Sequence, residues 1–239
     1  MAKKVAKITE NLCKNALCII DRGLSNGLRS KGKVCIEYAI AIASGQPEDR
    51  DGPTCVHPSL RSFKIGLNDE LPFDNEQHRA KALRRIGIAQ LGTDKGFSWK
   101  KFTTALHAYN KKFLADYLVA ATPKVKPVPK SFQAIVVKAL KTQIRANLED
   151  AQNIINNLIE DAEERSESKV ESPNSPNFIS NLCYASNDVE PNFEAYIEGI
   201  VQILKKMKTP GSKFLYLTEG KKKFKLDAAI QASLDKITK

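Results

Sequence analysis

The chain has 239 residues, of which 42% are hydrophobic and 27% are charged, and its formal net charge is +11 at pH 7. This length and hydrophobic content allow one large packed domain or two small ones, and no apolar run approaches the roughly 18 residues that a membrane-spanning helix needs. The excess of positive charge favours acidic partners, of which nucleic acid is the commonest, and we expect no membrane partner.

Two helices are expected in the N-terminal region. Apolar residues recur at three- and four-residue steps between Val5 and Ile19, and Gly23 follows where a left-handed C-cap residue belongs. The nearly all-apolar stretch 34–44 predicts a second, buried helix, which Gly45 ends. Because the basic N-terminus is not followed by an uninterrupted apolar core, we expect no signal peptide.

Three further helices are expected before residue 122. Pro58 suits the first turn of a helix that runs to about residue 68. Asp74 or Asn75 should cap a helix over 76–91, and Ser98 should cap a helix over 99–121. The five helices together predict an N-terminal helical domain, a bundle over residues 1–121.

A Pro- and Lys-rich segment, "TPKVKPVPK", covers residues 122–130. Proline cannot continue a helix, and this composition favours an extended spacer. The sequence therefore predicts a linker at 122–130 and a second region over residues 131–239.

The second region is also expected to be helical. Apolar positions predict one long helix over 131–165, which should pack against another helix or another subunit. A loop rich in Ser, Asn and Pro over 166–191 and a helix over 192–208 follow. Alternating residues in 213–217 and 222–226 predict a small β-hairpin, and a final helix begins after its expected N-cap, Asp227. The expected fold class is therefore mainly α.

Five cysteines are scattered along the chain, at positions 13, 18, 35, 55 and 183. An odd number at irregular spacing does not indicate a disulfide framework. We therefore expect reduced thiols and an intracellular, cytoplasmic protein.

The loop "EDRDGPTCVHP" places acids, Cys55 and His57 within a few residues. Cys55 and His57 could form a zinc site with Cys35 and one of Cys13 or Cys18, and Glu37 is a further possible ligand. Alternatively, Cys35 or Cys55 could meet His78 or His107 as a nucleophilic pair, so a small metal- or cysteine-dependent enzyme is one hypothesis. Zinc-ligand spacing and a family signature are both missing, and Gly52-Pro53 is typical of a turn. We interpret the loop as a structural turn in which Cys55 and Val56 fill the core, and we predict no cofactor.

Basic residues beside aromatic residues form the candidate nucleic-acid-binding positions. One group lies on the predicted helix 76–91, and a second lies at the start of the next helix beside Trp99. A third group lies on the predicted hairpin. They are Arg79, Lys81, Arg84, Arg85, Lys100, Lys101, Lys213, Lys221, Lys222, Lys223 and Lys225.

The leading prediction is a non-enzymatic binding or assembly protein that engages nucleic acid, or a nucleoprotein complex, by neutralising phosphates. The alternative is a structural or adaptor protein that binds a protein partner or itself through the helix over 131–165. An acidic block over 147–198 lies between basic blocks, so opposite charges could meet between copies.

Overall fold

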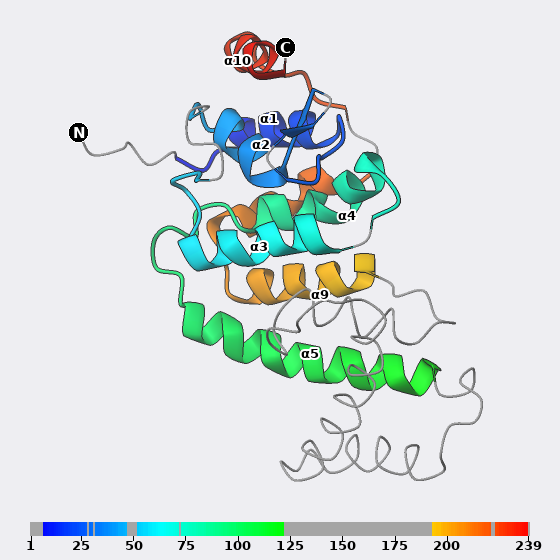
Figure 1. The fold of residues 1–239 in the computed structure, drawn as a ribbon. Coiled ribbons are helices and arrows are strands. Elements are labelled where there is room, and N and C mark those ends of the chain that lie inside the picture. The colour runs from blue at the N-terminus through cyan, green and yellow to red at the C-terminus, as the bar shows by residue number, and fades with distance from the viewer. Residues whose placement is uncertain are drawn as a thin grey trace. The chain divides into compact units, whose positions relative to one another are not determined.

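The computed structural model describes residues 7–27, 29–30, 32–46, 52–71, 73–121, 193–220 and 223–238, and these residues are mainly helical (Figure 1). The α-helices are α1 (Glu10–Ile20), α2 (Ile36–Ala43), α3 (Pro58–Glu70), α4 (Glu76–Ala89), α5 (Trp99–Ala121), α9 (Phe193–Lys206) and α10 (Ala228–Thr238). A 3-10 helix, η1 (Pro210–Thr218), follows α9, and two short strands, β1 (Arg29–Ser30) and β2 (Lys33–Val34), pair antiparallel. None of the helices in these described ranges is both long and apolar enough to cross a membrane.

The chain forms two compact units, one of residues 1–105 with 193–239 and one of residues 106–192. The first unit therefore unites the N-terminal helices with α9, η1 and α10, whereas the sequence grouped these C-terminal elements with residues 131–192. The predicted linker over 122–130, the long helix over 131–165 and the loop over 166–191 lie outside the described residues.

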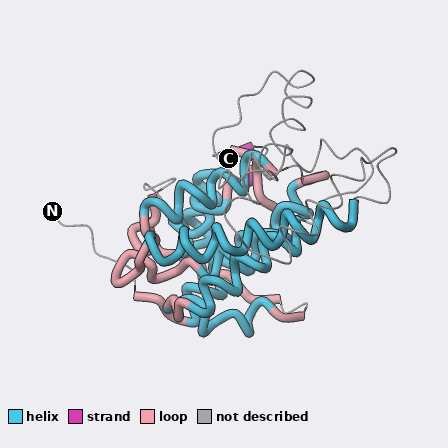
Figure 2. Tube along the Cα trace, turned by 90° about the horizontal axis from the view of Figure 1, so that it is seen from below, coloured by secondary structure: helices cyan, strands magenta, loops and turns pink. Residues whose placement is uncertain are grey.

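Helix α4 is the centre of the first unit, because it packs against α1, α2, α9 and η1 (Figure 1). Figure 2 shows that the described residues are mainly helices joined by loops. Leu83, Ile86 and Ile88 of α4 are fully buried. An added Cβ on Gly87 would lie 3.0 Å from Ile36 Cδ1, so the glycine allows α2 to approach α4 closely.

Local capping signals set most of the helix boundaries. Thr9, His57 and Asn75 are the N-caps of α1, α3 and α4, and each accepts a backbone N–H with its side chain. Ser98 Oγ accepts from Lys101 N at 3.3 Å, and Pro58 opens α3. The predicted starts of these helices after Pro58, Asn75 and Ser98 are therefore confirmed.

The β-hairpin expected at 213–217 and 222–226 is wrong, because residues 213–217 lie within η1. The start of η1 is fixed on α4, where Thr209 Oγ1 donates to Ala89 O at 2.6 Å and Gly211 N donates to Leu91 O at 2.8 Å. Residues 223–227 pair with no strand and run along α1, where Cys18 Sγ donates to Phe224 O. Contacts with α4 and α1 thus replace the cross-strand contacts that alternation suggested.

The loop before α3 is a structural turn, as expected. Val56 N donates to Pro53 O at 3.2 Å, and Cys55 and Val56 are 0% and 3% exposed. At the other end of α3, Asp69 Oδ1 accepts from Gly27 N at 3.0 Å and Asn68 Nδ2 donates to Ser25 O. Both ends of α3 are therefore joined to neighbouring segments.

Candidate nucleic-acid interface

Four helix ends meet at one end of the first unit: the N-termini of α3 and α5 and the C-termini of α4 and α9. Gly92 N, just past α4, donates to Cys55 O at 2.8 Å, and His57 N donates to Thr93 Oγ1 at 3.0 Å. The turn between α9 and η1 packs against the same junction. Pro210 lies so close to Gly92 that a Cβ added to Gly92 would be 2.7 Å from Pro210 Cβ. These contacts fix the segments around residues 55–58, 92–99 and 207–211 against one another.

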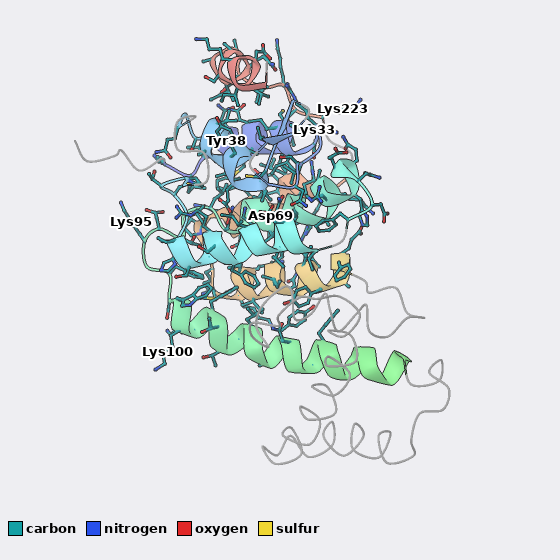
Figure 3. All side chains as sticks on the ribbon, in the orientation of Figure 1. Lys33, Tyr38, Asp69, Lys95, Lys100 and Lys223 are labelled. Atoms are coloured by element: carbon teal, nitrogen blue, oxygen red, sulfur yellow. The ribbon has the colours of Figure 1, made fainter. Side chains whose placement is uncertain are left out.

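Exposed lysines are concentrated at this junction. Lys95 and Lys100 lie on the same side of the unit in Figure 3. Ile8 packs against Gly92, because a Cβ added to Gly92 would be 3.0 Å from Ile8 Cγ1. Lys7 precedes Ile8 in the chain and therefore also lies at this junction. We call the exposed lysines here the lysine end: Lys7, Lys95, Lys100, Lys101, Lys205, Lys206 and Lys208.

The local charge at the lysine end is positive. Residues 92–101 contain one acidic residue, Asp94, and residues 205–213 contain none. The first turns of α3 and α5 also lack acidic residues, whereas those of α1, α2, α4 and α9 each carry a glutamate. The exposed lysines therefore favour an anion at this junction, whereas the positive dipole ends of α3 and α5 are offset by the negative ends of α4 and α9.

Aromatic rings lie beside these lysines. The rings of His57 and Trp99 are stacked, with centroids 6.2 Å apart and an interplanar angle of 6°, and Trp99 stacks on Phe102 with centroids 5.3 Å apart. Phe97 packs against His57 at 5.4 Å. Lys100 and Lys101 directly follow Trp99, as the sequence analysis noted, and both are exposed.

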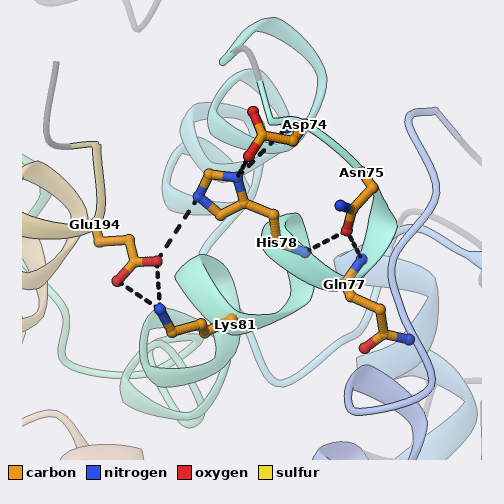
Figure 4. Close-up of polar contacts among 6 residues, drawn as sticks. All are labelled: Asp74, Asn75, Gln77, His78, Lys81 and Glu194. Carbon is orange, nitrogen blue, oxygen red and sulfur yellow. Dashed lines mark hydrogen bonds and ion pairs between the residues drawn. The ribbon is translucent and has the colours of Figure 1, made fainter. Parts of the chain in front are cut away.

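The basic residues of α4 make contacts within the first unit, and their role in phosphate binding stays a prediction. Arg79 is only 7% exposed; its guanidinium donates to Asn68 O and Leu24 O and lies over the Phe73 ring. Lys81 Nζ donates to Glu194 Oε1 at 2.8 Å, next to the His78–Asp74 pair (Figure 4). Both side chains therefore contact groups of the same unit.

Arg84 and Arg85 also form ion pairs with carboxylates of the first unit. Arg84 Nε donates to Asp21 Oδ1 at 2.7 Å, and Arg85 Nε donates to Glu198 Oε2 at 2.8 Å. Both guanidinium groups also donate to Thr218, at its carbonyl and its hydroxyl oxygen. The carboxylates come from distant parts of the sequence, since Asp21 follows α1 and Glu198 lies on α9. The spacing of residues within α4 therefore gives no sign of these partners.

The third predicted group is described in part. Lys213 is exposed on η1 and lies 5.4 Å from the centroid of the Phe214 ring. Lys223 and Lys225 are exposed on the segment along α1, and Figure 3 shows Lys223 on the side away from Lys95. Lys221 and Lys222 lie outside the described residues.

Within the described ranges, Cys13, Cys35 and Cys55 are buried free cysteines and Cys18 is partly exposed. Burial raises the pKa of the Cys55 thiol to about 12, and the nearby Glu37 carboxylate adds to the rise. His57 uses Nδ1 to accept from Ser59 N, while the Cys35 sulfur accepts from Tyr38 N as the N-cap of α2. Across the described ranges, no group of three or more His, Cys, Asp or Glu side chains could hold a metal ion. This geometry does not support the Cys55–His57 enzyme hypothesis.

A buried ion pair joins α2 to α3. Glu37 and Lys64 form this pair, and both side chains are 0% exposed. Burial raises the pKa of Glu37 and lowers that of Lys64, and the charge of each partner opposes the shift in the other. The sequence analysis considered Glu37 only as a possible ligand, and an acid within a nearly all-apolar helix was the available signal of a buried partner.

No protein-family model, curated protein or solved structure gives a significant match to this chain. The functional argument therefore depends on the geometry of the lysine end.

Proposed function

We propose that the protein is a non-enzymatic nucleic-acid-binding protein whose lysine end neutralises backbone phosphates. The observation that carries the proposal is the set of seven exposed lysines around one junction. Among the described residues, none of these lysines forms an ion pair, in contrast to Lys81, Arg84 and Arg85 of α4. Their charge is therefore available to a partner.

The mechanism is electrostatic. Each phosphate that a lysine contacts releases condensed counterions, so affinity comes from charge and decreases as salt increases. The first backbone N–H groups of α5 would add donors for phosphate oxygens, and no carboxylate in its first turn repels an anion. Lysine is a flexible point charge, so these contacts position a backbone and do not read a base sequence.

Charge reversal at the lysine end tests the proposal. We expect Lys100→Glu/Lys101→Glu to weaken binding of a fluorescent oligonucleotide by at least about tenfold at about 50 mM salt, measured by anisotropy. The matched control, Lys223→Glu/Lys225→Glu, changes the net charge equally on the side away from Lys95 and should have a much smaller effect. Equal losses in the two variants would mean that net charge, and not the lysine end, drives association.

Self-association or a protein partner is the alternative function. It depends on the predicted helix over 131–165, which lies outside the described residues, and on the alternating charge blocks of the sequence. Light scattering over a range of salt concentrations tests it, because a protein that stays monomeric throughout does not assemble through those blocks.

A further inference from the structure

The aromatic rings at the lysine end run from the core to the surface. Phe102 is 0% exposed, whereas Trp99, Phe97 and His57 are partly exposed. The planes of His57 and Trp99 differ by 6°, and those of Trp99 and Phe102 by 27°. We call these four residues the aromatic ladder. Its buried end holds the ladder in place, and its outer rings reach the surface beside the lysines.

Charged and aromatic groups alternate closely along this part of the chain. Lys95 is two residues before Phe97, and Lys100 and Lys101 directly follow Trp99. His57 Nδ1 is occupied by Ser59 N at 3.2 Å, and this bond orients the imidazole ring at the start of α3. The outer rings are thus held by contacts with one another and with Phe102, and exposed lysines are close to them in the sequence.

We infer that the lysine end binds single-stranded nucleic acid, with unpaired bases stacking on the outer rings of the aromatic ladder while the lysines bind phosphates. This inference rests on the proposed function and adds the class of nucleic acid. Stacking on aromatic rings tolerates any base but needs an accessible base face, which a duplex hides between neighbouring pairs. Lysines alone would bind single strands and duplexes through phosphate, without such a preference.

The chain contains one tryptophan, Trp99, and it lies in the ladder. Its intrinsic fluorescence therefore reports on the proposed site without a label or a substitution. A base that stacks on the outer rings is expected to quench this fluorescence, whereas an abasic strand bound at the same lysines brings no base to the ladder.

The test compares three probes with the full chain at low salt: a thymidine oligomer of about 12 nucleotides, an abasic oligomer with the same number of phosphates, and a duplex of the same length. We expect the thymidine oligomer to bind about tenfold more tightly than the abasic oligomer, and to be the one probe that quenches Trp99. Equal affinities without quenching would overturn this inference and leave the proposed function intact. Failure of all three probes to bind would contradict both.

A conservative variant provides a second measurement. Phe97→Leu keeps an apolar side chain but removes a ring, so we expect it to reduce the preference for the thymidine over the abasic oligomer several-fold. Affinity for the abasic oligomer should not change. Phe73→Leu is the matched control, because Phe73 is also partly exposed but packs against His78 and Arg79. An unchanged preference in Phe97→Leu, or an equal loss in Phe73→Leu, would contradict a role for the ladder.

Discussion

Removing one partner of the buried Glu37–Lys64 pair should severely destabilise the first unit. Both side chains are 0% exposed, so Lys64→Met leaves a carboxylate between α2 and α3 without its cation. The loss of one partner of a buried pair typically costs about 3–5 kcal/mol of unfolding free energy. Because small domains are stable by only about 5–15 kcal/mol, this one substitution would remove a large share of the total.

The double variant Glu37→Leu/Lys64→Met removes both charges but keeps buried side chains at the two positions. Replacing both charges removes the desolvation cost of each, so we expect an unfolding free energy within about 1 kcal/mol of the wild type. Urea denaturation followed by far-ultraviolet circular dichroism measures all three proteins, since the described residues are mainly helical. A cost below about 1 kcal/mol for Lys64→Met would refute the reasoning, because it would mean that Glu37 reaches water.

The effect of pH on Lys64→Met has a definite sign. Burial raises the pKa of Glu37 above its ordinary value of 4.5, so the folded state binds a proton more readily than the unfolded state. The unfolding free energy of Lys64→Met should therefore differ least from that of the wild type below pH 4.5. The difference should grow as pH rises from 4.5 to the pKa of Glu37 in the folded state. A deficit that is independent of pH would contradict a buried charge as the cause.

Three further predictions concern other parts of the same unit. Arg79→Ala should lower the unfolding free energy by about 2–4 kcal/mol, because it leaves two buried carbonyls without a donor, whereas Lys81→Ala on the exposed face should cost less than about 1 kcal/mol. Gly211→Ala should lower the thermal midpoint more than Gly96→Ala, since its Cβ would clash with Ile88 O, while that of Gly96 meets nothing within 4 Å and adds only the strain of a positive φ of 69°. Asp227 accepts from two asparagines of α1, which lowers its pKa below 3.8, so the stabilisation lost in Asp227→Ala should be constant above pH 3.8 and shrink as pH falls through the folded pKa.

Each of these predictions has an outcome that contradicts it. Equal losses for Arg79→Ala and Lys81→Ala would mean that the Arg79 guanidinium is not buried. Similar midpoints for the two glycine variants would mean that η1 does not lie against the end of α4. For Asp227→Ala, a difference from the wild type that grows on acidification would reverse the expected sign.

The sequence predicted the helix boundaries well because the signals that set them are local. A cap residue such as Asn75 or Ser98 bonds to an N–H two or three residues away, and Pro58 restricts its own backbone. The turn before α3 was recognisable for the same reason, since Gly52-Pro53 determines its geometry nearby in the chain.

Long-range pairing was not predictable from spacing. The helical periodicity of α4 places Arg84 and Arg85 on its polar, solvated face. They nevertheless form ion pairs with Asp21 and Glu198, which are far away in the sequence. The exposed lysines of residues 205–208 are more than 100 positions from Lys100 in the sequence, and long-range contacts such as Thr209–Ala89 and Gly211–Leu91 bring the two segments together. Lys100 and Lys101 were identified from sequence because the adjacent Trp99 marked them.

The salt dependence of oligonucleotide binding tests the central claim most directly. The logarithm of the association constant for a single-stranded oligomer, plotted against the logarithm of salt concentration, should have a steep negative slope in the wild type. In Lys100→Ala/Lys101→Ala the slope should become shallower by about 1.4, because each lost phosphate contact contributes about 0.7 for a single strand. A slope that does not differ between the two proteins, or the absence of binding at about 50 mM salt, would contradict a phosphate-binding role for the lysine end.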